Sequence, residues 1–201
     1  MPEFPRDVLE LLRQPLEDRR ITISRATMAL EFPCSILLVA AMNPCPCGYQ
    51  GDPNRRCTCA PQAIAKYRAR ISGPLLDRMD LQVDVPSAPF DKLADSRRGE
   101  SSETVQARVQ AARERQERRF RNSPTRSNGM MTPSEIETQA VPPPEGVELL
   151  RKASERLGLS ARAYSRILKV ARTIADLADS EKLQTPHLAE AIQYRKLDRV
   201  G

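Results

Sequence analysis

Four of the five cysteines in this 201-residue chain lie between residues 45 and 59, and they restrict the local fold more than any other feature. The order is Cys45-Pro-Cys47, nine residues, then Cys57-Thr-Cys59. Two such pairs around a Gly-containing loop can close a tetrahedral thiolate site in which protein fills every position. Such a site is structural, and Zn²⁺ is the expected metal, with iron as the open alternative. Two disulfides or free thiols are the alternatives, and the one-residue spacing within each pair is tighter than most metal motifs.

The compartment expected for this chain favours a metal site over disulfides. The chain has no apolar run of membrane-spanning length, and its first residues, Met1 to Asp7, have no signal-peptide core. We therefore expect a cytoplasmic protein without a membrane partner. Paired cysteines in a reducing compartment are more often metal ligands than disulfides. The fifth cysteine, Cys34, is expected to be a small buried apolar residue.

The apolar pattern of the first half predicts an α/β domain. Hydrophobic residues make up 40% of the chain but aromatics only 4%, which favours helices and a small sheet. Residues 35–42 are a continuous apolar run, typical of a strand buried on both faces of a parallel sheet. Residues 81–85 alternate and predict another strand. Alternation at 21–24 and 28–32 predicts a β-hairpin with Arg25 near its tip.

The second half is predicted to be helical. Helix signals cover 102–121, a short segment capped at Thr132, 145–157, 160–178 and a last helix from Thr185, with further helices expected at 5–16 and 61–68. We therefore divide the chain into an α/β domain at 1–95, with a Cys-rich loop at 45–59, and an all-α domain at 96–201. The single histidine, His187, is expected to start a helix without a catalytic role.

The net charge of +6 is concentrated in one block. Residues 97–126 hold nine Arg and four Glu, which leaves a local charge of +5. A basic block of this kind suggests a polyanionic partner. A solvated helix with mixed charges is the equally open alternative.

Three segments carry a resemblance to a known family. They are Leu-Val-Ala-Ala-Met-Asn-Pro-Cys-Pro-Cys-Gly at 38–48, the block from Tyr67 to Asp80, and the block from Leu159 to Leu177. Together the chain resembles the C-terminal portion of AAA+ ATPases of the Mg-chelatase-like, ComM/YifB family. The resemblance covers nearly all of residues 1–200. It implies a partial AAA+ core followed by an all-α lid domain.

The resemblance also implies site residues. Asn43 would be sensor 1, whose amide orients the water that attacks the γ-phosphate. Arg78 would be the arginine finger that reaches the nucleotide of a neighbouring subunit. Arg162 would be the sensor-2 residue, and Arg166, one turn further along the same helix, is the second choice. Asn43, Arg78 and Arg162 are then expected to converge on one triphosphate.

The remaining parts of an ATPase site are not found in these residues. No Gly-x-x-x-x-Gly-Lys-Ser/Thr motif occurs. The family runs Asp-Glu-Leu-Pro-Glu-Phe into its next helix, whereas this chain starts Met1-Pro2-Glu3-Phe4. We therefore expect that the Mg²⁺-coordinating acids precede Met1 and that the chain alone does not hydrolyse ATP.

The implied function is that of a hexameric motor that uses ATP and Mg²⁺ to drive DNA branch migration during natural transformation. Arg25 would contact DNA phosphate from the hairpin, and Arg55 and Arg56 from the Cys-rich loop. Three alternatives remain open. They are an ATPase subunit of magnesium chelatase, a non-enzymatic zinc-knuckle DNA-binding module, and an inactive remnant.

Overall fold

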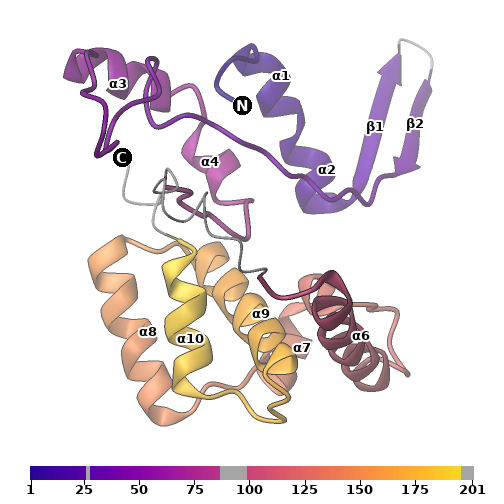
Figure 1. Ribbon diagram of the computed structural model, residues 1–201. Coiled ribbons are helices and arrows are strands. Elements are labelled where there is room, and N and C mark those ends of the chain that lie inside the picture. Colours follow the sequence, from indigo (N-terminus) through magenta and orange to yellow (C-terminus); the bar gives the residue numbers. More distant parts are fainter. Residues whose placement is uncertain (26–27, 87–98, 196–201) are drawn as a thin grey trace. The chain divides into compact units, whose positions relative to one another are not determined.

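The computed structural model describes residues 1–25, 28–86 and 99–195, and these divide into two compact units (Figure 1). The first unit contains residues 1–79 and 85–86 of the described chain, and the second contains 80–84 and 99–195. Each unit has its own hydrophobic core. The predicted boundary at residues 95–96 lies outside the described residues. None of the described helices is both long and apolar enough to cross a membrane.

The first unit is built on short helices. They are α1 (Arg6–Leu11), α2 (Arg13–Asp18), α3 (Pro61–Arg68) and α4 (Gly73–Leu76), so the helix predicted at 61–68 is confirmed and that at 5–16 is divided in two. Leu9, Ile71 and Leu75 form the core, which brings α1 against the α4 region. The side chain of Ser72 accepts from the Leu75 N–H and caps α4.

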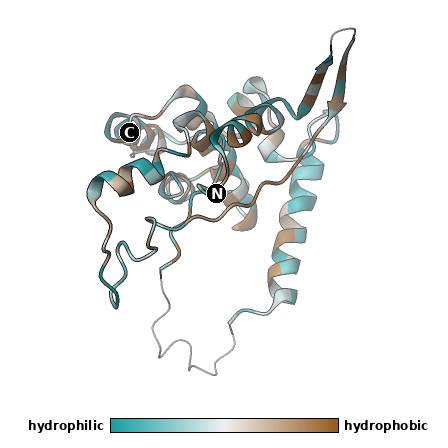
Figure 2. Cartoon of the chain, turned by 90° about the horizontal axis from the view of Figure 1, so that it is seen from above, coloured by the Kyte–Doolittle hydropathy of each residue, from teal (hydrophilic) through white to brown (hydrophobic). Residues whose placement is uncertain are grey.

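The predicted hairpin is present. Strands β1 (Arg20–Arg25) and β2 (Met28–Pro33) pair antiparallel, and Arg19 with φ of 53° ends α2 and turns the chain into β1. Ile21 lies opposite Phe32 and Ile23 opposite Leu30, so large apolar side chains share one face of the ribbon, and Figure 2 shows apolar residues along it. Every described residue of both strands is exposed.

The two other predicted strands are not formed. Residues 35–42 run without a ladder partner, and their apolar side chains are largely exposed, with Leu37 at 91% and Val39 at 85%. Residues 81–85 also lack strand structure, although the Gln82 N–H donates to the Tyr194 carbonyl. A strand needs a neighbour to receive its backbone hydrogen bonds, and the described residues provide no parallel partner. The predicted parallel sheet is therefore absent from the described part of the chain.

The second unit is helical, as predicted. Its elements are α6 (Ser102–Arg119), the 3₁₀ turn η1 (Asn128–Met130), α7 (Pro133–Gln139), α8 (Pro144–Leu157), α9 (Ala161–Leu177) and α10 (Thr185–Gln193). The predicted capping box of α7 is present, with Thr132 and Glu135 bonded reciprocally. Ser160 caps α9, and Gly158 ends α8 with φ of 64°. His187 stands in the first turn of α10 and accepts from the Gln184 N–H.

Helix α9 is the centre of this unit. It contributes Ile167, Leu168 and Ala171 to the buried core, where they meet residues of α7, α8 and α10. Figure 1 shows α8, α9 and α10 side by side. Close contact between α8 and α10 depends on Gly146, because a Cβ there would lie 2.4 Å from the Leu188 Cδ1 atom.

A buried carboxylate joins α9 to the preceding elements. The Asp176 side chain is fully buried and accepts from both Nη atoms of Arg119 on α6 at 2.7 and 2.5 Å. It also accepts from Asn128 of η1 at 2.7 Å and from Arg172 at 3.1 Å. Burial raises the pKa of Asp176, but the hydrogen bonds from Arg119 and Asn128 outweigh it and hold this pKa below its usual value.

Replacing this carboxylate should destabilise the helical unit. Asp176→Asn leaves the buried Arg172 and the half-buried Arg119 without their counter-charge, and we expect a loss of about 3–5 kcal/mol in the free energy of unfolding. Denaturant unfolding followed by far-UV circular dichroism measures it. The control is Asp179→Asn, which removes the exposed partner of Arg115 and should cost less than about 1 kcal/mol. Equal losses in the two variants would show that Asp176 does not anchor the unit.

Candidate functional site

The four cysteines of the loop at 45–59 come together in the first unit. Their sulfur atoms all lie within 4.8 Å of one another, an arrangement that can hold a metal ion. Cys45 Sγ is 3.4 Å from Cys47 Sγ and 3.6 Å from Cys57 Sγ. Cys45 is fully buried and the other three are half-buried. Cys34 is not part of this group and is half-buried rather than buried.

Local backbone conformation shapes the loop. Gly48 and Gly51 have φ of 85° and 81°, which favour glycine, and the Gly48 N–H donates to the Cys45 carbonyl at 3.0 Å. The Asp52 carboxylate accepts from the N–H groups of Asn54 and Arg55 at 2.7 and 3.0 Å. These turns bring the second cysteine pair back onto the first.

Helix α3 holds the loop from one side. Arg68 donates from Nε to the Pro44 carbonyl at 3.2 Å and from Nη2 to Gln50 Oε1 at 2.9 Å. The Tyr67 phenol is hydrogen-bonded to the backbone of Asn43, and burial is the main cause of its raised pKa. Sequence reasoning gave neither side chain a role, although both stand in the block from Tyr67 to Asp80 that carries the family resemblance.

The thiols do not ionise equally. Backbone hydrogen bonds at Tyr49 and Thr58 lower the pKa of Cys47 to about 6. The Cys47 backbone lowers the pKa of Cys59, but the neighbouring thiols and burial outweigh it and raise that pKa to about 12. The pKa of Cys57 is raised as well, where burial and the thiols of Cys47 and Cys45 outweigh a backbone hydrogen bond at Cys59. One thiolate therefore forms readily, whereas further ionisation needs a cation to neutralise the crowded charge.

Two residues predicted to contact the nucleotide lie in this unit. Asn43 is exposed and comes two residues before Cys45, at the end of the apolar segment. Arg78 follows α4, and its side chain is only 9% exposed. Its Nη1 donates to the Pro74 carbonyl at 2.6 Å, and its Nε lies 3.2 Å from Oε2 of Glu17. The guanidinium is thus held against its own unit.

The predicted sensor-2 residues lie in the second unit. Arg162 is exposed in the first turn of α9, next to the Ser160 cap. Arg166 is one turn further on, with a side chain that is 15% exposed and an ion pair with Asp80. Each of these residues is placed within its own unit. Their expected convergence with Asn43 and Arg78 stays a prediction.

The predicted nucleic-acid contacts are at the surface. Arg25 is exposed at the end of β1, opposite Met28. Arg55 donates from Nη1 to the Tyr49 hydroxyl at 2.7 Å, and its guanidinium lies 5.1 Å from the centre of the Tyr49 ring. Arg56 is exposed beside it. Tyr49 was not predicted as part of this surface.

Several arginines of the basic block have acidic partners. Arg108 pairs with Glu100, Arg115 with Asp179 and Arg119 with Asp176. Asp176 and Asp179 lie beyond residue 126, so part of the charge excess counted over 97–126 is neutralised from outside the block. These pairs favour the interpretation of α6 as a mixed-charge helix. Arg97 and Arg98 lie outside the described residues.

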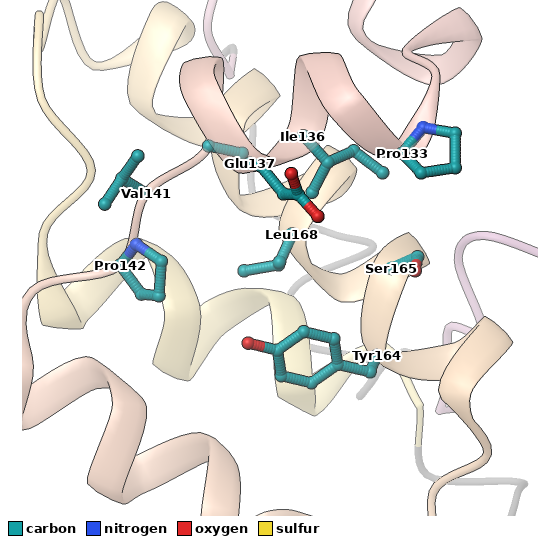
Figure 3. A pocket seen from close by; sticks show the side chains of 9 residues that line it. Pro133, Ile136, Glu137, Val141, Pro142, Tyr164, Ser165 and Leu168 are labelled. Atoms are coloured by element: carbon teal, nitrogen blue, oxygen red, sulfur yellow. The ribbon is translucent and has the colours of Figure 1, made fainter.

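A separate hollow of about 310 Å³ lies in the second unit, between α7 and α9. Figure 3 shows its mostly apolar lining, which includes Ile136, Val141 and Leu168, with Glu137, Tyr164 and Ser165 as polar members. None of the predicted phosphate-contacting residues lines it. Nothing about this hollow points to a nucleotide.

Comparisons with known proteins cover both units. Residues 1–93 match the family described as magnesium chelatase, subunit ChlI, and residues 99–195 match the description of the C-terminal region of that subunit. The competence protein ComM of Haemophilus influenzae is 46% identical over 202 residues, and YifB of Escherichia coli is 43% identical over the same length. An uncharacterised protein of Mycobacterium tuberculosis is 36% identical over 196 residues.

These relatives are longer proteins. The alignments cover 100% of this chain for ComM and YifB and 96% for the mycobacterial protein, but only 38% of each relative. The matching region is the C-terminal part of ComM and YifB. The chain therefore belongs to the Mg-chelatase-like family that includes ComM and YifB.

Proposed function

We propose that this chain is the C-terminal part of an ATP-dependent DNA motor that drives branch migration during natural transformation. The observation that carries the proposal is 46% identity, along the whole chain, to a relative named as a competence protein. The motor would be a cytoplasmic homo-hexamer. Because residues 1–201 contain no phosphate-binding loop motif, ATP and Mg²⁺ would be bound mainly by other parts of the full-length protein.

The proposed roles use polar groups of both units. Asn43 would orient the attacking water through its amide, and Arg162 would contact the γ-phosphate of its own subunit. Arg78 would stabilise negative charge on the phosphoryl group bound to a neighbouring subunit. Arg166 is the second candidate for the contact made by Arg162.

The exposed apolar segments fit a partial AAA+ core. Residues 35–42 and 81–85 would become strands of a parallel sheet, with neighbours from the remainder of a full-length protein. Leu37 and Val39 are 91% and 85% exposed. Their burial would favour formation of the sheet by about 1.5–3 kcal/mol for each side chain. Asn43 would then stand at the end of a central strand, where many α/β proteins bind ligands.

The four cysteines are proposed to bind one structural Zn²⁺. A tetrahedron with Zn–S distances of about 2.3 Å has S–S edges of about 3.8 Å. The S–S distances of 3.4 and 3.6 Å among Cys45, Cys47 and Cys57 are close to this value. With four protein ligands the metal would have no open position, so it would stabilise the loop without acting on substrate.

Magnesium chelatase activity is the second candidate. It is favoured by the family description, which names a chelatase subunit for both matching segments. A chelatase would act on a tetrapyrrole instead of DNA, and the Cys-rich loop is not expected in that branch. Stimulation of ATP turnover by DNA, with no effect of a porphyrin, would favour the motor. The reverse result would favour the chelatase.

The zinc site predicts selective metal loss. Freshly purified, reduced chain should contain about one zinc per chain by elemental analysis, and Cys45→Ser and Cys57→Ser should lose it. Acid should release the metal, since protonation removes the thiolate ligands. Cys34→Ser is the matched control and should keep its zinc. A wild-type chain prepared this way without any metal would rule the site out.

The finger assignment predicts an effect in trans. In full-length protein, Arg78→Ala subunits mixed with subunits whose own nucleotide site is inactivated should regain ATP turnover, because an intact site then meets the intact finger of its neighbour. The loss in a fully mutant ring should reach about 10³-fold or more, as for other arginine fingers. Mixed rings with no more turnover than either variant alone would show that neighbours do not depend on Arg78.

The hairpin assignment predicts a change in salt dependence. Arg25→Ala in the full-length protein should weaken DNA binding and reduce the slope of log K against log salt by about 1 for each chain that contacts DNA. Arg20→Ala, at the other end of β1 and paired with Glu31, is the control and should leave the slope unchanged. An unaltered slope for Arg25→Ala would remove that residue from the DNA contact.

A further inference from the structure

The predicted arginine finger is bound within its own chain. Arg78 Nε lies 3.2 Å from the Glu17 carboxylate, and Nη1 donates to the Pro74 carbonyl at 2.6 Å. The Arg78 side chain is 9% exposed and that of Glu17 is 31% exposed. A guanidinium in this position faces a carboxylate instead of open solvent.

The hydrophobic core fixes both partners of this ion pair. Glu17 is in the last turn of α2, and Leu16 beside it packs against the core formed by Leu9, Ile71 and Leu75. Arg78 follows α4, and Met79 beside it packs against the same core. Because both side chains start from backbone held by packing, the pair forms with less loss of side-chain entropy than one between flexible loops.

We propose that Glu17 is a positioning residue that holds Arg78 in a resting position from which a neighbouring subunit's nucleotide releases it. This inference rests on the proposed function of Arg78 as a finger. The carboxylate carries one negative charge, whereas a triphosphate with bound Mg²⁺ carries about two and offers more acceptor oxygens. The nucleotide of a neighbour can therefore displace Glu17, while an empty neighbouring site leaves the resting pair in place.

A second arginine has a similar arrangement. Arg166 of α9 pairs with Asp80, which lies two residues after Arg78 in the sequence and belongs to the second unit. Its side chain is 15% exposed. Two of the arginines predicted to contact phosphate thus face carboxylates of their own chain. Competition between carboxylate and phosphate would apply to both.

The resting pair can be tested without ATP hydrolysis. Phenylglyoxal modifies accessible guanidinium groups, and mass spectrometry of the whole 201-residue chain reports each arginine separately. Arg78 should react more slowly than exposed Arg56 in wild type, and Glu17→Gln should raise its rate about fivefold, as expected for loss of a partly exposed ion pair. Glu10→Gln is the matched control, since Glu10 contacts Arg13 and Ser72 in the same unit. It should leave the Arg78 rate unchanged.

The functional arm uses the full-length protein. Glu17→Gln should raise kcat for ATP about two- to fivefold with little change in KM, because the released finger acts on the transition state. Glu17→Asp, which keeps the charge, should restore slow modification of Arg78. A folding defect would appear instead as faster modification of many arginines together, and this outcome would count against the proposal.

Two results would overturn the resting position. The first is an Arg78 modification rate that is equal in wild type and Glu17→Gln. The second is faster modification accompanied by unchanged or lower kcat, which would mean that the pair does not compete with catalysis or holds Arg78 in its working position. If Arg78→Ala has no effect in trans, the finger assignment fails, but the modification experiment still reports whether Glu17 holds Arg78.

Discussion

Four sulfur atoms held within 4.8 Å of one another cannot all ionise without a cation between them, and this constraint governs the loop at 45–59. The pKa of Cys47 is lowered to about 6 while that of Cys59 is raised to about 12, so charge on one thiol opposes charge on the next. A divalent cation bound between the sulfur atoms would offset the repulsion between the thiolates. The loop that it would stabilise begins two residues after Asn43, and Arg68 fixes the same stretch from α3. Metal binding and the position of Asn43 are therefore linked by the backbone between them.

Helix α9 of the second unit has a buried, anchored end and an exposed end. Asp176, near the C-terminal end of α9, joins Arg119 of α6, Asn128 of η1 and Arg172 in one buried network. Arg162, in the first turn of the same helix, is exposed. A continuous helix transmits the position of its buried end to its exposed end. The network can thus orient Arg162 without touching it.

Local signals in the sequence predicted the helices well, because caps act over three or four residues. Ser160, Thr132 and Gly158 each mark a helix end where the structure has one. The strand predicted at 35–42 is not formed in the described residues, since an apolar run specifies burial but a strand also needs a hydrogen-bonding neighbour. The four-cysteine cluster was predictable from the two closely spaced cysteine pairs together with the expected reducing compartment. The contact between Glu17 and Arg78 was not, because the sequence does not show which residues the core brings together.

The charge of a loaded metal site bears on where DNA would bind. Zn²⁺ with four thiolates carries a net charge of −2, whereas Arg55 and Arg56 with Asp52 give the loop at 45–59 a charge of +1. The loaded loop is then slightly negative, and Arg55 is already engaged with Tyr49. Arg25 has no comparable negative centre within the hairpin, where the described carboxylate, Glu31, pairs with Arg20 at the other end of β1. On electrostatic grounds the hairpin is the stronger of the two predicted phosphate contacts. Metal binding would weaken the attraction between the loop at 45–59 and DNA phosphate, while making the loop more rigid.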